Sequence, residues 1–334
     1  MKQNFVADLQ DGQNITCHFL VCEKEIRATR EGKSYLRLEL GDATGRVEAR
    51  MWEGFDRSAA TFERDDFVKV QARVENYRNK LQLAIEKIRR AEESEVEVAD
   101  FFAHTKESVE QLYATLVEIA AAMHNPWLRR LVESVVLDAE MVPRLKRAPA
   151  AKVMHHAFFG GLLEHVISLC GLCRVVLSHY PEADPDLLIA GAILHDIGKL
   201  EELSYERSIG YTDEGQLLGH IMIEYEFVSK RIDAIEGFPA ALKTLVQHML
   251  IAHHGKYEFG SPKLPMFREA LMLHYLDDLD SKMGAVRAAL ESDKGEGNWT
   301  AFSGALERRI LRTDGFLTGT KSELEPQMNT DKHR

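Results

Sequence analysis

The chain has 334 residues, of which 45% are hydrophobic and 28% are charged, and its formal net charge is −11. This composition is typical of a globular protein of roughly two domains at about 150 residues each, and the acidic balance argues against a surface that simply coats polyanions. The N-terminus lacks the apolar stretch of a signal peptide, and no run approaches the ~20 apolar residues that span a bilayer. Because the four cysteines are also too few for a disulfide framework, we expect a cytoplasmic protein that contacts no membrane.

Up to about Arg90 the sequence alternates apolar and polar residues with a period of two. Five such stretches, separated by turn residues such as Gly41-Asp42, predict five short antiparallel strands. Five short strands suit a small closed barrel, and the OB-fold is the commonest barrel with five. The apolar positions run over 15–21, 36–40, 47–51, 68–74 and 81–85.

Beyond the barrel the apolar spacing becomes helical. The stretch AEESEVEVADFF is acidic and poorly patterned, and we interpret it as part of a linker. Tyr180-Pro181 is expected to end one helix and Asp184-Pro185 to open the next. The fold class is therefore predicted as an N-terminal all-β OB-fold barrel followed by an all-α domain. The expected boundaries are 1–90 for the barrel, 91–107 for the linker, 108–317 for the helical domain with a metal core at about 150–290, and 318–334 for a flexible tail.

Histidine and aspartate recur inside apolar helical segments, where polar side chains are rare. Any one of them could be a hydrogen-bonded core residue. An ordered series favours a shared metal, because adjacent ionisable residues such as His195-Asp196 in ILHDIGKL are costly to bury without compensation. Imidazoles together with carboxylates are ligands of divalent first-row metals. The series consists of His165, His195, Asp196, His220, His253, His254 and Asp277.

The order H…HD…H…HH…D, with HDIGK, resembles the HD-domain metal-dependent phosphohydrolases over about 150–290. With a preceding barrel and the flanking segments HHAFFGGLLEH and HHGKYEFGSP, nearly the whole chain is similar to the YhaM-type 3′-to-5′ exoribonucleases. His155 and His156 open the first of these segments and could line the substrate entrance, or serve only to begin a helix. The resemblance implies two divalent ions, with Mn favoured and Fe, Co, Ni or Mg as alternatives.

The resemblance also implies how the ligands are divided. Asp196 would bridge the two ions, which fits its chemistry because a carboxylate offers two oxygens. Asp277 is favoured as the inner ligand, and Asp278 and Asp280 remain alternatives. Lys199, one helical turn after the HD pair, can reach a phosphate oxygen as a point charge, and a solvated lysine at a helix end is the alternative. The first ion would be held by His165, His195, Asp196 and Asp277, and the second by Asp196, His220, His253 and His254.

The barrel carries aromatic and basic residues on the predicted outer face of its second and third strands. OB-folds bind oligonucleotides on this face, where aromatic rings stack on bases and arginines follow the phosphates. The hairpin Tyr77-Arg78-Asn79-Lys80 would add a basic lip. An ordinary polar exterior is the alternative, although Trp and Tyr gain little from exposure without a ligand. The candidate nucleic-acid-binding residues are Tyr35, Arg37, Arg46, Arg50, Trp52, Arg78 and Lys80.

These features predict a metal-dependent phosphodiesterase in which Asp196 and Lys199 serve the reaction. The resemblance implies 3′-to-5′ hydrolysis of single-stranded RNA to nucleoside 5′-monophosphates, with single-stranded DNA as a possible second substrate. Self-association is left open. Two alternatives remain: an HD-type nucleotide or cyclic-nucleotide phosphohydrolase whose barrel serves assembly, and a nucleic-acid-binding factor whose metal site is structural.

Overall fold

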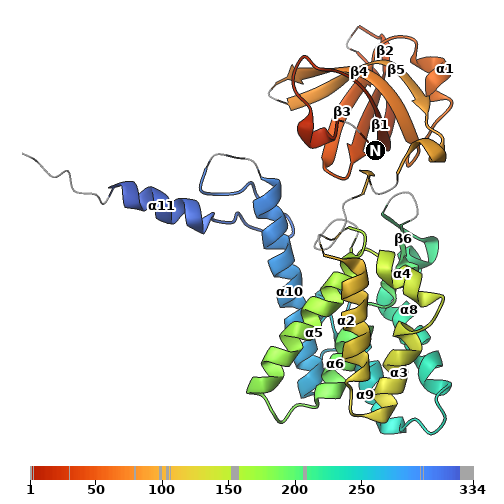
Figure 1. The fold of residues 1–334 in the computed structure, drawn as a ribbon, viewed down its shortest axis with the longest axis vertical. Helices are drawn as coiled ribbons and strands as arrows, with labels where there is room; N and C mark the ends of the chain where they lie inside the picture. The colour runs from red at the N-terminus through yellow and green to blue at the C-terminus, as the bar shows by residue number, and fades with distance from the viewer. Residues whose placement is uncertain are drawn as a thin grey trace, which may run out of the picture.

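The structure is a computed structural model that describes residues 2, 4–29, 31–78, 80–97, 100–102, 105, 107–151, 158–205, 209–293, 295 and 297–323. His155 and His156 lie outside the described residues. Figure 1 shows a β-barrel formed by the N-terminal part of the chain above a bundle of helices formed by the remainder. The predicted fold class, an OB-fold barrel followed by an all-α domain, is thereby confirmed.

The barrel is closed by five strands in the order β1-β2-β3-β5-β4. Its neighbouring strands are antiparallel, except that β3 and β5 run parallel where Ala49 pairs with Leu83. Side chains alternate as the sequence predicts, so that Leu36, Leu38 and Leu40 are fully buried in the barrel core. The strands are β1 (Asn14–Ala28), β2 (Ser34–Asp42), β3 (Gly45–Met51), β4 (Phe67–Tyr77) and β5 (Lys80–Arg90), with the short helix α1 (Phe55–Ala59) between β3 and β4.

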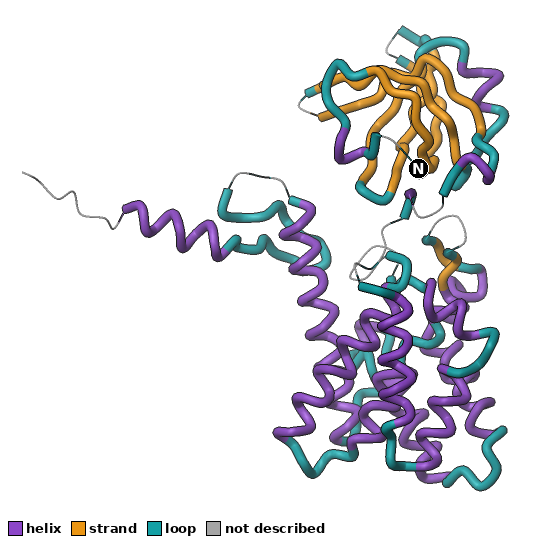
Figure 2. The backbone as a smooth tube through the Cα atoms, viewed as in Figure 1, coloured by secondary structure: helices purple, strands orange, loops and turns teal. Residues whose placement is uncertain are grey.

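The helical domain is built around α6, which is apolar on all sides and buried from Asp186 to Leu194. The predicted helix boundaries around α6 are confirmed, because the Asp184 carboxylate accepts hydrogen bonds from the first backbone N–H groups and Pro185 occupies the first turn. Figure 2 shows one short strand pair within this domain, β6 (Leu203–Ser204) with β7 (Gly210–Tyr211). The helices are α2 (Val109–Ala121), α3 (Pro126–Val136), α4 (Met141–Arg147), α5 (Gly161–His179), α6 (Pro185–Leu194), α7 (Lys199–Glu202), α8 (Asp213–Asp233), α9 (Ala240–Ala252), α10 (Arg268–Ser292) and α11 (Thr313–Glu323).

The segment predicted to be a linker contributes to packing between the two domains. Phe101 lies against Phe67 of the barrel, with ring centroids 4.7 Å apart, and Phe102 lies 4.9 Å from Phe159 of the helical domain. All four rings are buried in one apolar cluster. The sequence does not indicate this packing, because the two phenylalanines follow an acidic stretch and belong to no periodic apolar pattern.

Two further expectations need correction. The helix α5 is long and apolar enough to cross a bilayer by length and composition alone, contrary to the expectation that no run qualifies. Its buried face, which includes Leu162, Leu169 and Cys173, packs in the core of the helical domain, as the core helix of a globular protein would. In addition, α11 continues to Glu323, into the segment predicted to be a flexible tail.

Candidate metal centre and nucleic-acid interface

Five segments of the helical domain converge on the histidines and aspartates singled out in the sequence. His165 lies on α5, His220 on α8 and Asp277 on α10. His195 and Asp196, the HD pair, directly follow α6, and His253 and His254, the HH pair, directly follow α9. Because α6 is enclosed by its neighbours, its C-terminal end delivers His195 and Asp196 into the interior, where each is at most 2% exposed.

The first group of ligands contains His165, His195 and Asp277, whose donor atoms lie within 4.8 Å of one another. The Nε2 atoms of His165 and His195 are 3.4 Å apart. Asp277 Oδ1 lies 3.2 Å from His165 Nε2 and 3.7 Å from His195 Nε2. Two imidazoles and one carboxylate therefore present their donor atoms to a common point.

The second group contains His220, His253 and His254, again with donor atoms within 4.8 Å. The Nε2 atoms of His220 and His254 are 3.2 Å apart. His253 Nε2 is buried and has no hydrogen-bond partner among the described residues. A buried nitrogen without a partner is costly, and a coordinated cation would satisfy it.

Asp196 stands between the two groups. Its Oδ2 atom lies 3.4 Å from His195 Nε2 and 3.8 Å from His165 Nε2, on the side of the first group. Its Oδ1 atom lies 3.7 Å from His220 Nε2, on the side of the second group. One carboxylate thus offers one oxygen to each group, which is the arrangement required of a bridging ligand.

In each of the five histidines Nε2 faces the cluster and Nδ1 faces an oxygen atom. A hydrogen bond from Nδ1–H to that oxygen leaves Nε2 as the nitrogen with an available lone pair. His195 Nδ1 lies 3.0 Å from the Ala192 carbonyl, and His253 Nδ1 lies 2.7 Å from the Leu250 carbonyl. A carbonyl can only accept, so Nδ1 carries the proton and the lone pair of Nε2 points into the cluster. The remaining Nδ1 partners are Asp280 for His165, Glu202 for His220 and the Phe259 carbonyl for His254.

Charge in the cluster is balanced around Asp196. Burial alone would raise the pKa of Asp196, but Lys199 and His195 hold it well below its usual range, so the carboxylate is ionised. Lys199 Nζ donates to Asp196 Oδ2 at 2.7 Å. Burial and the neighbouring imidazoles lower the pKa of His253 well below its usual range, so this histidine is neutral. At His195 the carboxylates of Asp196 and Asp277 outweigh burial, and at His165 those of Asp277 and Asp280 outweigh it, so the pKa values of both histidines are raised and a divalent ion would displace a proton from these rings. Converging imidazole nitrogens around an ionised carboxylate are donors that fit a divalent centre.

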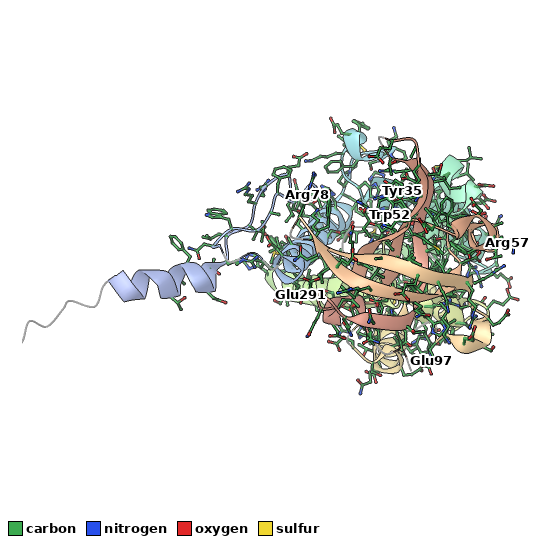
Figure 3. All side chains as sticks on the ribbon, turned by 90° about the horizontal axis from the view of Figure 1, so that it is seen from above. Tyr35, Trp52, Arg57, Arg78, Glu97 and Glu291 are labelled. Carbon is green, nitrogen blue, oxygen red and sulfur yellow. The ribbon has the colours of Figure 1, made fainter. Side chains whose placement is uncertain are left out.

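On the barrel, the structure brings three aromatic rings and two arginines into one patch. The rings of Tyr35 and Trp52 are 4.6 Å apart between centroids, and Figure 3 shows them side by side. The Arg50 guanidinium lies 5.9 Å from the Trp52 ring and 5.6 Å from the Tyr77 ring. Arg78 lies 5.3 Å from the Tyr77 ring. These five residues are called the aromatic patch below.

Carboxylates are paired with the predicted arginines of the barrel, including Arg50 of the aromatic patch, which lies 2.6 Å from Glu48. Arg37 is paired with Glu23, Glu25 and Glu48, and Arg46 is paired with Glu39. A phosphate would have to compete with those carboxylates, so none of these arginines is as available as the sequence suggests. Lys80 begins β5 and is exposed beside the hairpin.

Comparison with known proteins agrees with this architecture. Residues 21–91 match the family described as OB-fold nucleic acid binding domain, and residues 162–282 match the HD domain family. The 3′-5′ exoribonuclease YhaM of Geobacillus sp. (strain WCH70) is 38% identical over 305 residues, which cover 91% of this chain and 93% of that protein. The protein of the same name from Bacillus subtilis (strain 168) is 37% identical over 306 residues, with 91% and 96% covered. The chain belongs to the YhaM family.

In this YhaM family member, the geometry separates the three candidate aspartates of α10. Asp277 faces the cluster, whereas Asp278 pairs with Lys282 at 2.6 Å. Asp280 lies behind His165, with its Oδ2 atom 2.8 Å from Nδ1, so it orients a ligand rather than being one. The sequence favours Asp277 but leaves Asp278 and Asp280 as alternatives, and the geometry of the cluster agrees with Asp277.

Two glutamates beside the centre escaped sequence analysis. Glu202 Oε1 accepts both the backbone N–H and the Nδ1–H of His220, each at 3.1 Å. Glu224 is completely buried, with its Oε1 atom 3.6 Å from His253 Nδ1, and burial raises its pKa well above the usual range. Glu224 lies four residues after His220 on the same helix, and that spacing was the only available sign of its position.

The loop that follows His253 and His254 contacts the centre through its main chain. The main-chain carbonyl of Phe259 accepts from His254 Nδ1 at 2.7 Å. The side chains of this loop point outward, so that Tyr257 is 63% exposed and Phe259 is 53% exposed. Lys256 Nζ lies 5.1 Å from the Phe259 ring. The loop therefore fixes a ligand with its backbone and presents two rings and a cation to solvent.

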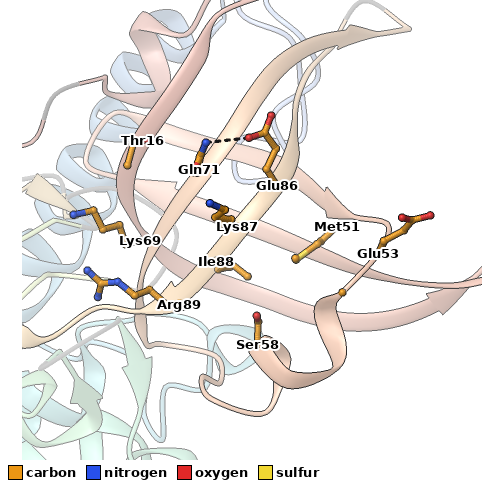
Figure 4. Close-up of a pocket in the computed structure, with 11 residues that line it drawn as sticks. Thr16, Met51, Glu53, Ser58, Lys69, Gln71, Glu86, Lys87, Ile88 and Arg89 are labelled. Atoms are coloured by element: carbon orange, nitrogen blue, oxygen red, sulfur yellow. Dashed lines mark hydrogen bonds between the residues drawn. The ribbon is translucent and has the colours of Figure 1, made fainter.

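The barrel of this family member also has a groove of about 560 Å³, whose lining residues do not include those of the aromatic patch. It is formed by outward residues of β1, β4 and β5 and by the segment that leads into α1, as Figure 4 shows. Lys69, Lys87 and Arg89 give it basic character, but Glu86 and Glu53 also line it. Because charges of both signs line it and Met51 and Ile88 are the large apolar residues there, the groove has fewer features of a base-stacking surface than the aromatic patch.

Proposed function

We propose that this chain is a metal-dependent 3′-to-5′ exoribonuclease that hydrolyses single-stranded RNA to nucleoside 5′-monophosphates. The observation that carries the proposal is the position of Asp196 between two groups of converging histidine nitrogens. The YhaM relatives, which are named 3′-5′ exoribonucleases, support the direction of cleavage.

The centre is proposed to hold two divalent ions, with Mn favoured and Fe, Co, Ni or Mg as alternatives. The mixture of imidazole and carboxylate donors supports this choice, because such donors suit first-row divalent metals. When bound, a pair of such ions supplies an activated water and neutralises charge on the phosphate that is attacked. Asp196 and Asp277 would contribute the negative charge that holds the ions, and the five histidines would contribute nitrogen donors.

The chain's own residues are proposed to position the substrate. Lys199 lies beside Asp196 at the centre, where its ammonium group is within reach of a phosphate drawn to the same place. Tyr257 and Phe259 are proposed to stack on the bases nearest the cleaved bond, because they are exposed rings of the loop whose Phe259 carbonyl accepts from His254. The aromatic patch on the barrel is proposed to hold the RNA further upstream.

Preference for RNA would come from binding rather than from the chemistry. Hydrolysis by a water nucleophile does not involve the ribose 2′-OH, so single-stranded DNA is a possible second substrate. Contacts with the 2′-OH are what allow a protein to distinguish the two. A parallel assay with DNA of the same sequence would measure the preference.

The proposal can be tested by incubating the protein with Mn²⁺ and single-stranded RNA labelled at either end. RNA labelled at the 3′ end should release a labelled nucleoside 5′-monophosphate immediately, and RNA labelled at the 5′ end should shorten progressively. A 3′-phosphate should slow digestion, whereas a blocked 5′ end should not. Asp196→Ala is the inactive control.

Other outcomes would identify a different function. Internal fragments or 3′-monophosphates, detected by mass spectrometry, would contradict the proposed reaction. Hydrolysis of free cyclic nucleotides alone would favour an HD-type nucleotide phosphohydrolase whose barrel serves assembly. Binding of metal and RNA without hydrolysis would favour a nucleic-acid-binding factor with a structural metal site.

A further inference from the structure

Helix α10 presents a ridge of large apolar side chains to solvent. Leu271, Tyr275, Leu279 and Met283 follow one another at intervals of four residues and are between 45% and 62% exposed. Residues four apart lie on one face of a helix, so these side chains form a continuous row. Single exposed apolar residues are ordinary, but a contiguous exposed row marks an interaction surface. These four residues are called the α10 ridge below.

A groove adjoins the N-terminal end of the ridge. Its volume is about 420 Å³, and it lies between α5 and α10. Val176 and Tyr180 line it from the α5 side, and Leu271 and Tyr275 of the α10 ridge line it from the other. Met266, just before α10, is 79% exposed. Glu182 and Arg268 also line the groove, so the groove and the ridge form one largely apolar surface with two charged residues at its edge.

The described residues that follow α10, namely 293, 295 and 297–323, belong to an arm. It contains a small hairpin with bridges between Trp299 and Leu311 and between Ser303 and Arg308, and then α11. Arg312 fastens the arm to the end of α10 by donating to the carbonyls of Leu290 and Asp293. Figures 1 and 2 show α11 projecting away from the helical bundle.

The arm exposes large apolar side chains. Trp299, Phe302, Phe316 and Leu317 are between 49% and 65% exposed. A lone two-stranded hairpin is only marginally stable in water, and here polar bonds rather than a large core hold it in shape. A preformed segment with four exposed apolar side chains is therefore expected to bury them against a partner surface.

We propose that the chain forms a two-fold homodimer in which the α10 ridges of two copies pack antiparallel and each arm covers the groove of the other copy. The spacing of the ridge supports a second copy as the occupant. A two-fold axis at its centre places Leu271 opposite the partner's Met283 and Tyr275 opposite the partner's Leu279, so that the same surface is complementary to itself.

The antiparallel arrangement also explains the position of the arm. The arm begins after Ser292, about 25 Å along α10 from Tyr275 at 1.5 Å per residue, so it starts far from the groove of its own chain. In an antiparallel pair, the C-terminal end of one α10 lies near the N-terminal end of the other. The arm would then start beside the partner's groove and the partner's Met266.

The first test is the mass of the full-length protein, measured by light scattering during size-exclusion chromatography. The wild type should have twice the mass of one chain at micromolar concentration. Tyr275→Glu with Leu279→Glu should give a single-chain mass, and Phe302→Asp in the arm should raise the dimer dissociation constant at least tenfold. Ile26→Glu, at an exposed apolar position of the barrel, should leave the dimer unchanged. Circular dichroism would show that each variant is folded.

The second test determines the direction of packing. Leu271→Cys combined with Met283→Cys should give a covalent dimer with a short bismaleimide, whereas either single cysteine variant should not, because positions 271 lie about 18 Å apart along the helix in an antiparallel pair. Efficient cross-linking of each single variant would indicate parallel helices and overturn the proposal. A wild type that remains a single chain at every concentration, or a dimer that survives the double glutamate substitution, would also overturn it.

Discussion

Each of the five histidines in the candidate metal centre has an oxygen atom within hydrogen-bond distance of its Nδ1 atom, on the side away from the cluster. Asp280 holds His165 across 115 positions of sequence, and Glu202 holds His220 across 18. Such outer partners determine the tautomer and the direction of the ring, so they matter nearly as much as the ligands. The histidines are therefore oriented by two carboxylates and three main-chain carbonyls, and the sequence pattern indicated the histidines but not these partners.

Replacing Asp196 with alanine is expected to remove the carboxylate shared by the two groups of histidines. Metal content, measured by elemental analysis of the purified protein, should fall sharply, and RNA hydrolysis should be lost. The same change leaves the Lys199 ammonium, whose side chain is 14% exposed, without its partner, which should destabilise the fold by about 1–3 kcal/mol. Adding Lys199→Met should recover much of that stability without recovering metal.

The matched control for this experiment is Asp278→Ala. Asp278 is adjacent to the ligand Asp277 but pairs with Lys282 on the surface, so its removal should leave metal content unchanged. Equal metal content in the wild type and the Asp196→Ala protein would show that Asp196 is not shared by the two groups.

Phe259 offers a second test at the level of single residues. Its carbonyl holds His254, but its exposed ring is free to contact substrate, so Phe259→Ala should remove the ring and keep the hydrogen bond. Loss of one base stack should cost about 1–3 kcal/mol, seen as a higher KM for RNA with unchanged metal content. Tyr257→Phe retains an aromatic ring and should have little effect. An unaltered KM in Phe259→Ala would assign this ring to the protein surface alone.

At the scale of elements, the distinctive feature is a kink in α8. Gly219 has φ 71° and ψ 156°, so the helix is interrupted immediately before His220. The interruption frees the His220 backbone N–H, and the Glu202 carboxylate accepts it together with the ring N–H. At Gly198, in HDIGK, a Cβ atom would lie 2.2 Å from the His220 carbonyl oxygen, so only glycine permits the close approach of α7 and α8.

Gly219→Ala is expected to disturb the centre through the backbone. This conformation is almost restricted to glycine, so alanine should cost about 1–3 kcal/mol or shift His220 out of place. Denaturant unfolding and RNA hydrolysis measured together would detect either outcome. Gly171→Ala in α5, where a Cβ atom would meet nothing within 4 Å, should be neutral or slightly stabilising. Unchanged stability and activity in Gly219→Ala would show that the kink is dispensable.

The elements differ in how well the sequence predicts them. The five strands and the start of α6 follow from period-two alternation and from capping residues, which are local properties of the chain. The ligands follow from polar residues at buried helical positions. The kink at Gly219, the packing of Phe101 and the roles of Glu202 and Asp280 depend on contacts between distant segments, so no local pattern announces them.

At the scale of the whole molecule, a barrel with an aromatic patch is joined to a metal centre through a shared apolar cluster. Leu20 and Phe67 of the barrel, Phe101 and Phe102 of the linker and Phe159 of the helical domain form this cluster. A buried connection of this kind limits independent motion of the two domains. RNA binding by the barrel and hydrolysis at the centre can be tested separately by comparing long and short substrates on the same protein.

Trp52→Ala should weaken binding of a long single-stranded RNA by about 1–3 kcal/mol, because the ring that stacks with Tyr35 is lost from the aromatic patch. Hydrolysis of a small phosphodiester that is too short to reach the barrel should be unchanged. Lys87→Ala, in the separate groove on the β4 and β5 side, should have a smaller effect and serves as the matched control. Binding would be measured by fluorescence anisotropy with metal withheld, so that cleavage does not interfere. If Lys87→Ala costs as much as Trp52→Ala, or if Trp52→Ala binds normally, the RNA follows a different face of the barrel.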